Sequence, residues 1–146
     1  MTPRKKAPAK PKITADQRKS WRTLPIADWN TLTVQVMITE LNRDRYGVET
    51  YIPAAGGYRF EQGVIKRALT LYGAEALRET IERAFAEHRV TPQYPQLTAG
   101  FLITYMLPRI MPQVLAERAK TQQRKERAES AVFNGGMTAE EIADFL

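Results

Sequence analysis

The chain has 146 residues, with 22 Lys and Arg against 16 Asp and Glu, and a net charge of +6. It contains no Cys, which excludes disulfide scaffolds, thiol catalysis and Cys-ligated zinc or iron–sulfur sites. Its single His excludes a metal site built on two His ligands. Because 43% of the residues are hydrophobic, the chain can bury a core, and its length fits one domain with tails.

The positive charge is distributed unevenly along the chain. Residues 1–25 hold eight bases and one acid, whereas residues 26–115 hold nine of each. Residues 116–133 hold five bases and three acids, and residues 134–146 hold three acids and no base. The pattern indicates a neutral body with a basic arm, a mildly basic late segment and a small acidic end.

The N-terminal segment is predicted to be a disordered basic arm over residues 1–13. Residues 1–12 consist almost entirely of Lys, Arg, Pro and Ala. The prolines remove backbone donors and disfavour a helix, so the arm should stay extended. No apolar stretch follows the charges, which argues against a secretory signal.

Two helices should follow the arm. Thr14 is a good N-cap for a short helix that we expect to reach about Leu24, where Pro25 stops it. A second helix is predicted to begin near residue 30 or 31 and to end at Gly47. Its apolar residues recur at helical spacing and should face the core: Val34, Met37, Ile38 and Leu41. Residues 48–57 read as a loop, with a short strand as an open alternative.

The middle of the chain predicts two further amphipathic helices, from about Arg59 to Tyr72 and from about Ala74 to His88. The first should bury Val64, Ile65, Ala68, Leu69 and Tyr72, and the second Leu77, Ile81, Ala84 and Phe85. A Pro-containing break over residues 91–95 ends this region.

The most apolar part of the chain lies over residues 99–107. Thr98 should cap a helix there, and because nearly every position is apolar, we expect this helix to be buried on all sides. A membrane span is excluded because Pro108, Arg109 and Pro112 interrupt the run before about 20 residues are reached. The helix should kink or restart at Pro108.

The body is predicted to end at Leu115, which should be buried like Ile110 and Val114. Residues 116–133 are helix-prone but lack an apolar stripe, so they should form a helix that projects from the body. Residues 138–146 are predicted to form a short acidic helix, because they carry a capping-box signature. The predicted fold class is therefore all-α: a compact bundle of about five helices over residues 14–115, with the projecting helix and the C-terminal helix over 116–146.

Basic side chains are the candidate contacts to a polyanion. Lys and Arg next to phosphates release condensed counterions and give affinity without sequence readout. The alternatives are a solubilising terminus and solvated helix faces. The candidates are Arg4, Lys5, Lys6, Lys10, Lys12, Arg18, Lys19, Arg22, Arg59, Lys66, Arg67, Lys120, Arg124 and Arg127.

Two of these groups have local signatures. Gly56-Gly57-Tyr58-Arg59 precedes a helix, and free amides at a helix start beside Arg59 suit a phosphate; a tight turn with Tyr58 packed down is the alternative, and the pattern is not a P-loop. Three late bases recur at i, i+4 and i+7 and form one stripe: Lys120, Arg124 and Arg127. The alternative there is a solvated helix with local Glu–Arg pairs.

Four tyrosines lie at predicted helix ends or in loops: Tyr46, Tyr51, Tyr58 and Tyr94. Exposed aromatic rings beside bases can stack on single-stranded nucleic acid. Loop tyrosines also commonly fix loops to the core, which is the alternative.

No catalytic constellation is present in the sequence. Gly-x-Ser-x-Gly, Walker and EF-hand patterns are missing, and we expect a non-enzymatic protein without metal or cofactor. Thr138–Leu146 resembles the first helix of a helix-turn-helix element, but no recognition helix follows it. We therefore expect this helix to contact a protein partner through Ile142, Phe145 and Leu146, or to pack on the body.

Residues 63–107 carry a recognisable order of features. A helix ends in Tyr-Gly (Ile65-Lys-Arg-Ala-Leu-Thr-Leu-Tyr-Gly73), an acidic helix follows, and a Tyr-Pro turn (Thr91-Pro-Gln-Tyr-Pro-Gln-Leu-Thr98) precedes an apolar helix from Phe101. This order resembles the C-terminal helical regions of phage replisome-organiser and helicase-loader proteins. The resemblance covers about a third of the chain and transfers no site residues. We find no counterpart here of the winged-helix domain that those proteins usually carry.

These observations predict a phage-type accessory protein in replication, recombination or packaging. It should bind the nucleic-acid backbone electrostatically, with DNA favoured over RNA, in the cytoplasm of a bacterial host and without a membrane contact. The alternative is a protein that modulates or inhibits a replication or transcription machine, such as RNA polymerase or a helicase. The oligomeric state stays open, although the late helix lacks the stripe of a strong coiled coil.

Overall fold

A computed structural model of the chain describes residues 14–134. Every element in this range is helical, which confirms the predicted all-α class. The elements are α1 (Ala15–Lys19), the 3₁₀ turn η1 (Ile26–Asp28), α2 (Thr31–Tyr46), α3 (Gly57–Tyr72), α4 (Ala74–Glu87), α5 (Ala99–Phe101), the π-helical turn η2 (Leu102–Met106) and α6 (Leu107–Asn134). The arm over 1–13 and the predicted C-terminal helix with Ile142, Phe145 and Leu146 lie outside the described residues.

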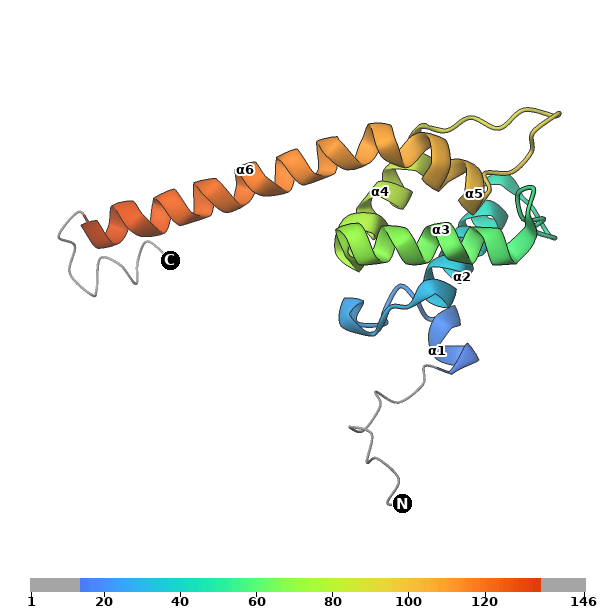
Figure 1. Cartoon of the computed structure of the whole chain (residues 1–146), viewed down its shortest axis with the longest axis horizontal. Helices are drawn as coiled ribbons and strands as arrows, with labels where there is room; N and C mark the ends of the chain where they lie inside the picture. Colours follow the sequence, from blue (N-terminus) through green and yellow to red (C-terminus); the bar gives the residue numbers. More distant parts are fainter. Residues whose placement is uncertain (1–13, 135–146) are drawn as a thin grey trace, which may run out of the picture.

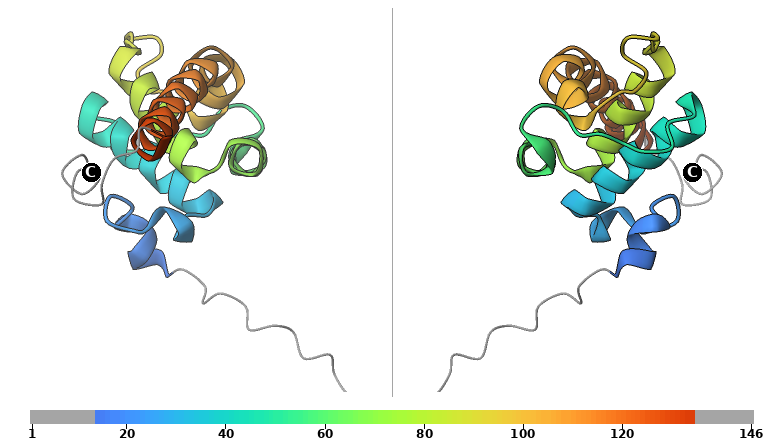
Figure 2. Two further views of the ribbon diagram at one scale, coloured as in Figure 1. Left: turned by 90° about the vertical axis from the view of Figure 1, so that its left-hand side faces the viewer. Right: turned by 90° about the vertical axis from the view of Figure 1, so that its right-hand side faces the viewer.

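The helices α2, α3 and α4 form the body together with α5, η2 and the start of α6 (Figure 1). Both views in Figure 2 place α6 and the N-terminal α1 on opposite sides of this body. The chain therefore enters the described part on one side and leaves it along α6 on the other.

The boundaries of α2 follow the predicted signals. The Asn30 side chain accepts a hydrogen bond from the Thr33 backbone N–H at 3.0 Å, and Gly47 ends the helix with a φ of 70°. This left-handed conformation is one that glycine adopts without a steric cost. All four predicted apolar positions of α2 are buried: Val34, Met37, Ile38 and Leu41.

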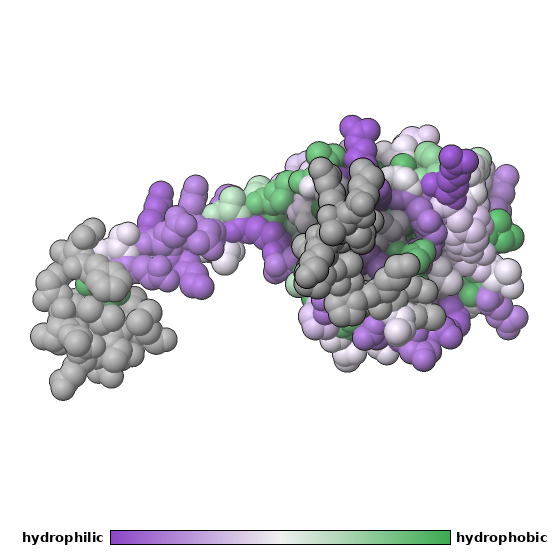
Figure 3. Space-filling view, turned by 60° about the horizontal axis from the view of Figure 1, so that its bottom comes forward, coloured by the Kyte–Doolittle hydropathy of each residue, from purple (hydrophilic) through white to green (hydrophobic). Residues whose placement is uncertain are grey.

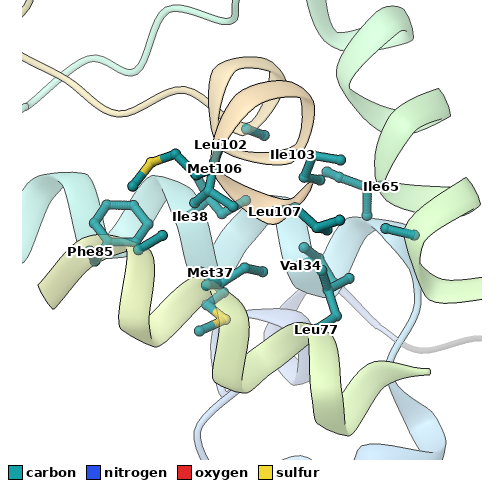
Figure 4. Close-up of a cluster of buried hydrophobic side chains, with 14 of the residues drawn as sticks. Val34, Met37, Ile38, Ile65, Leu77, Phe85, Leu102, Ile103, Met106 and Leu107 are labelled. Carbon is teal, nitrogen blue, oxygen red and sulfur yellow. The ribbon is translucent and has the colours of Figure 1, made fainter. Parts of the chain in front are cut away.

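The core lies where α2, α4 and η2 meet, with α3 closing one side (Figure 4). Met37 and Ile38 of α2 face Phe85 of α4, while Leu102 and Met106 of η2 cover them from above. Side chains that are fully removed from water in this way supply the main stabilising term, about 1.5–3 kcal/mol for each large aliphatic or aromatic group.

The N-terminal helix is shorter than predicted. It ends at Lys19 rather than near Leu24, and the chain turns at Ser20 before the unpredicted η1. The turn buries Trp21 and Trp29, whose rings meet edge to face at 6.3 Å. Burial of two indoles outweighs the continuation of one exposed helical turn, so tertiary packing ends α1.

The prediction of a helix buried on all sides over residues 99–107 is wrong. Leu102, Ile103 and Met106 are buried, but Phe101 and Tyr105 are exposed. The backbone passes through a π-turn, in which the Leu107 N–H donates to the Leu102 carbonyl. This wide turn lies directly before Pro108, which has no N–H to donate. The helix then continues without a break through Pro112.

The helix α6 remains attached to the body for one turn more than predicted. Leu115 is exposed rather than buried, yet Glu117 and Arg118 still form ion pairs with α4. After Arg118 every side chain through residue 131 is exposed, and the helix extends beyond the body (Figure 1). We call residues 119–134 the extended part of α6; at 1.5 Å per residue it is about 24 Å long.

Within residues 14–134, no helix is both long and apolar enough to cross a membrane.

Candidate nucleic-acid interface

The exposed surface of α3 carries only positive charge. Arg59, Lys66 and Arg67 are exposed and take part in none of the ion pairs of residues 14–134. The single carboxylate of this helix, Glu61, is fully buried. Nothing on α3 itself therefore offsets the charge of its three cations.

Glu61 is buried because it is fully hydrogen-bonded. Its Oε2 accepts from the backbone N–H of Gly100 at 2.8 Å and of Ala54 at 3.1 Å. The Tyr51 hydroxyl lies 2.6 and 2.9 Å from the two carboxylate oxygens, and the Gln35 amide donates to Oε1 at 3.1 Å. One side chain thereby connects α2, α3, the loop before α3 and the start of α5.

Glu61 is not among the residues predicted from the sequence. A signal was present, because Glu61 shares a helix face with Ile65 and Ala68, at i+4 and i+7, and both of these are buried. A carboxylate on the buried face of a helix needs hydrogen-bond or charged partners inside the protein. The close packing around Glu61 also requires a glycine at position 100, where a Cβ atom would lie 2.7 Å from the Cβ atom of Ala54.

We expect Tyr51 to make the fold sensitive to alkali. Burial, with the hydrogen bond to Glu61, raises the pKa of Tyr51 above its ordinary value of about 10. The folded protein keeps this proton at a pH at which the unfolded chain releases it, so stability is complete below pH about 10 and falls above it. Relative to Tyr51→Phe, wild-type unfolding free energy should fall by up to about 1.4 kcal/mol per pH unit between about pH 10 and 12. Urea unfolding of both proteins measures this, and parallel pH profiles contradict it.

The glycine pair before α3 forms a tight turn. Gly56 and Gly57 have φ values of 99° and 73°, and the Gly57 N–H donates to the Ala54 carbonyl at 2.9 Å. The Gly57 N–H is therefore not free to donate to a phosphate. This agrees with the tight turn, which was the alternative interpretation of this segment. Arg59, two residues after Gly57, is exposed.

Near the N-terminus, the predicted basic residues divide into two kinds. Arg22 is held inside the protein's own ion pairs, 3.2 Å from Glu40 and 3.1 Å from Asp44. Lys19 is exposed and forms no ion pair with the described residues. The five bases of residues 1–13 and the side chain of Arg18 lie outside the description.

The predicted late stripe is on the extended part of α6. Lys120, Arg124 and Arg127 are exposed there, and the local Glu–Arg pairs of the alternative interpretation are not formed among the described residues. Figure 3 shows mainly hydrophilic side chains along this segment. Because α3 is part of the body and the extended part of α6 lies beyond it, the basic residues of α3 and those of α6 do not form one continuous face (Figure 1).

Several other arginines of the body are paired with carboxylates, whereas Arg45 and Arg89 form no ion pair with the described residues. Arg83 pairs with Glu79 and Glu117, and the hydrogen bond from Arg83 lowers the pKa of Glu117. The remaining pairs join α4 to itself and to α6: Arg78 with Glu82, Arg109 with Glu87, and Arg118 with Glu75 and Glu79. The pairs that cross between the two helices add to the packing of α6 on α4.

Two of the four predicted stacking tyrosines have structural roles. Tyr51 is buried, and the Tyr46 hydroxyl donates to the His88 carbonyl at 3.2 Å. Burial also raises the pKa of Tyr46. Tyr58 is half exposed, and Tyr94, at 70% exposure, is the most accessible of the four.

Three exposed aromatic side chains were not predicted, Phe60, Phe101 and Tyr105, and the last two are neighbours. Phe101 is 43% and Tyr105 68% exposed, and their rings lie 5.2 Å apart. His88 lies 6.0 Å from Phe101 on the other side. The signal that could have revealed these two neighbours is Thr104 and Tyr105, the two side chains with hydroxyl groups in an otherwise apolar run.

The fold and surface define a class: an all-helical protein that carries groups of cations without ion pairs among the described residues, on α3 and on the extended part of α6. Among residues 14–134, no three acidic or His side chains converge as metal ligands. Comparison of the chain with protein-family models, with curated proteins and with solved structures gave no match.

Proposed function

We propose that the protein is a non-enzymatic accessory protein that binds the nucleic-acid backbone electrostatically, with DNA favoured over RNA. The observation that supports this most directly is the division of its cations into two sets. One set is paired with carboxylates, whereas the other, which includes the cations of α3 and of the extended part of α6, has no such partner in the described residues. The arm adds five bases and no acid in residues 1–13.

The unpaired cations lie on separate parts of the molecule, which suits a long polyanion. A phosphate backbone presents a regular row of charges that separate basic groups can contact at different points. A compact anionic ligand would need them to converge. The resemblance of residues 63–107 to phage replisome-organiser and helicase-loader proteins supports a role in phage replication, recombination or packaging.

A salt titration of duplex binding tests the proposal. The slope of log K against log salt changes by about 0.9 for each phosphate neutralised on duplex DNA. Neutralising Arg59, Lys66 and Arg67 to Gln should therefore flatten the slope by up to about 2.7, measured by fluorescence anisotropy of a labelled duplex.

The matched control neutralises three exposed, ion-paired arginines to Gln: Arg22, Arg43 and Arg109. It removes the same net charge from cations that the fold already uses, so its slope should stay closer to that of the wild type. Equal slopes for the two triple variants contradict a role for α3, and no binding at low salt overturns the proposed function.

One observation favours a second function, a protein-binding modulator of a replication or transcription machine. The extended part of α6 has exposed side chains from residue 119 to 131, and a helix of this length is only marginally stable alone in water. A protein partner would stabilise it. A stoichiometric partner that survives nuclease treatment, and is lost when residues 119–146 are removed, would favour this function over nucleic-acid binding.

A further inference from the structure

A cavity of about 620 Å³ lies between the loop from α4 to α5 and the start of α5. Its volume falls within the range of small-molecule sites, about 300–1,000 Å³. Tyr94 and Phe101 contribute aromatic rings to its wall, and Arg89 and Gln93 contribute polar groups. In Figure 1 this loop extends away from the helices before it returns to α5.

The loop that borders the cavity is held at its base. Asn42 of α2 binds both backbone groups of Leu97, accepting from its N–H at 2.7 Å and donating to its carbonyl at 2.8 Å. Gln96 makes the same reciprocal pair with Ile52, at 3.2 and 2.6 Å. These two clamps fix the cavity wall before any ligand arrives, which reduces the ordering cost of binding.

The tip of the loop is also a defined turn. The backbone groups of Thr91 and Tyr94 exchange hydrogen bonds at 3.1 and 3.0 Å, and the Thr91 hydroxyl accepts from the Tyr94 N–H at 3.1 Å. Tyr94 is thus positioned by its backbone while its ring stays 70% exposed. Aromatic rings with accessible faces are the side chains that stack on nucleobases.

The cavity also has a cation for a phosphate. Arg89 is exposed and takes part in none of the ion pairs of residues 14–134. Gln93 is exposed at the loop tip, where its amide offers a donor and an acceptor to the edge of a base. The aromatic rings match the face of a base, and the Gln93 amide matches its edge. The Arg89 guanidinium matches the phosphate.

The aromatic wall continues towards the basic surface of α3. Phe101 follows Gly100, and the Phe60 ring packs against Gly100, where a Cβ atom would lie 3.1 Å from the ring. Phe60 is 41% exposed and directly follows Arg59. The cavity and α3 are therefore connected through the contact of Phe60 with the residue before Phe101.

We propose that this cavity takes one unstacked base of a single-stranded nucleic acid, with the neighbouring phosphate at Arg89. This inference rests on the proposed function and names its substrate class. In a duplex the bases are paired and stacked, and a ring of the protein reaches one only after it has been flipped out. The cavity thus favours single strands, whereas the cations of α3 and α6 contact either form.

The test compares two labelled single strands of equal length by fluorescence anisotropy: an oligothymidylate and an abasic strand with the same phosphates. We expect wild type to bind the oligothymidylate more tightly. Tyr94→Ala and Phe101→Ala should each weaken oligothymidylate binding by about 5- to 150-fold and leave abasic binding unchanged. Tyr94→Phe, which keeps the ring, should bind like wild type.

Leu71→Ala is the matched control, since Leu71 is 60% exposed on α3 but does not line the cavity. It should leave both affinities unchanged. Arg89→Gln is a second test that spares the aromatic wall, and it should flatten the single-strand salt slope by about 0.7.

The outcomes separate this inference from the proposed function. Equal wild-type affinity for the two strands overturns the base-binding cavity and leaves backbone binding intact. Displacement of the oligothymidylate by thymidine monophosphate at similar concentration also overturns it, because the site then binds free nucleotide. Failure to bind either strand or the duplex overturns the proposed function and this inference together.

Discussion

Replacing Glu61 by Ala is expected to lower the free energy of unfolding by about 3–5 kcal/mol. The change leaves the Tyr51 hydroxyl, the Gln35 amide and the backbone N–H groups of Ala54 and Gly100 without their acceptor inside the core. Each unsatisfied buried group costs about 1–3 kcal/mol, and partial relaxation of the site reduces the sum. Urea unfolding followed by circular dichroism measures the loss.

Two further variants make this result interpretable. Glu61→Gln should be less damaging, because the Gln35 Oε1 atom has no hydrogen-bond partner among residues 14–134 and can accept from the new amide after small rotations. Glu49→Ala removes an exposed carboxylate that forms no ion pair with the described residues, and should change stability by less than about 0.5 kcal/mol. If Glu61→Ala unfolds like Glu49→Ala, the network is not a stabilising element.

Deleting residues 1–12 is expected to produce the largest change in nucleic-acid binding. The segment carries five bases, so the duplex salt slope should flatten by up to about 4.5, at about 0.9 per phosphate contact. That exceeds the change expected from the three cations of α3. A salt series with the full chain and the deletion variant measures it.

The control is a variant in which the order of residues 2–12 is scrambled at constant composition. Backbone binding does not depend on the order of the arm residues, so the scrambled arm should keep the wild-type slope and affinity. A slope unaffected by deletion contradicts a role for the arm. A loss of binding on scrambling indicates instead that the arm is recognised as a specific sequence.

Local signals in the sequence predicted the helices that begin and end at strong caps. Asn30 and Gly47 bound α2, and Gly73 separates α3 from α4, as predicted. Where a tertiary contact overrides a local preference, prediction failed. The burial of Trp21 and Trp29 ends α1 early, and nothing in the local pattern of residues 14–25 indicates that pairing.

The candidate site was less predictable than the fold, because it depends on which side of a helix meets the core. The apolar run over residues 99–107 has no clear period from which to choose a face, and only the hydroxyl groups of Thr104 and Tyr105 indicated the exposed side. The basic residues were identifiable by type, but their pairing was not. Arg22 and Arg59 look alike in the sequence, yet one binds two carboxylates and the other none among the described residues.

The π-turn at η2 has a consequence for the direction of the charged helix that follows it. In a helix with 3.6 residues per turn, one residue corresponds to about 100° of rotation about the axis. The wide turn, closed between Leu102 and Leu107, inserts one such step immediately before α6. It therefore determines the direction, about the helix axis, in which the basic stripe faces several turns later: Lys120, Arg124 and Arg127. A one-residue deletion in this turn would keep the spacing of these three residues but rotate the stripe by about 100° relative to the body.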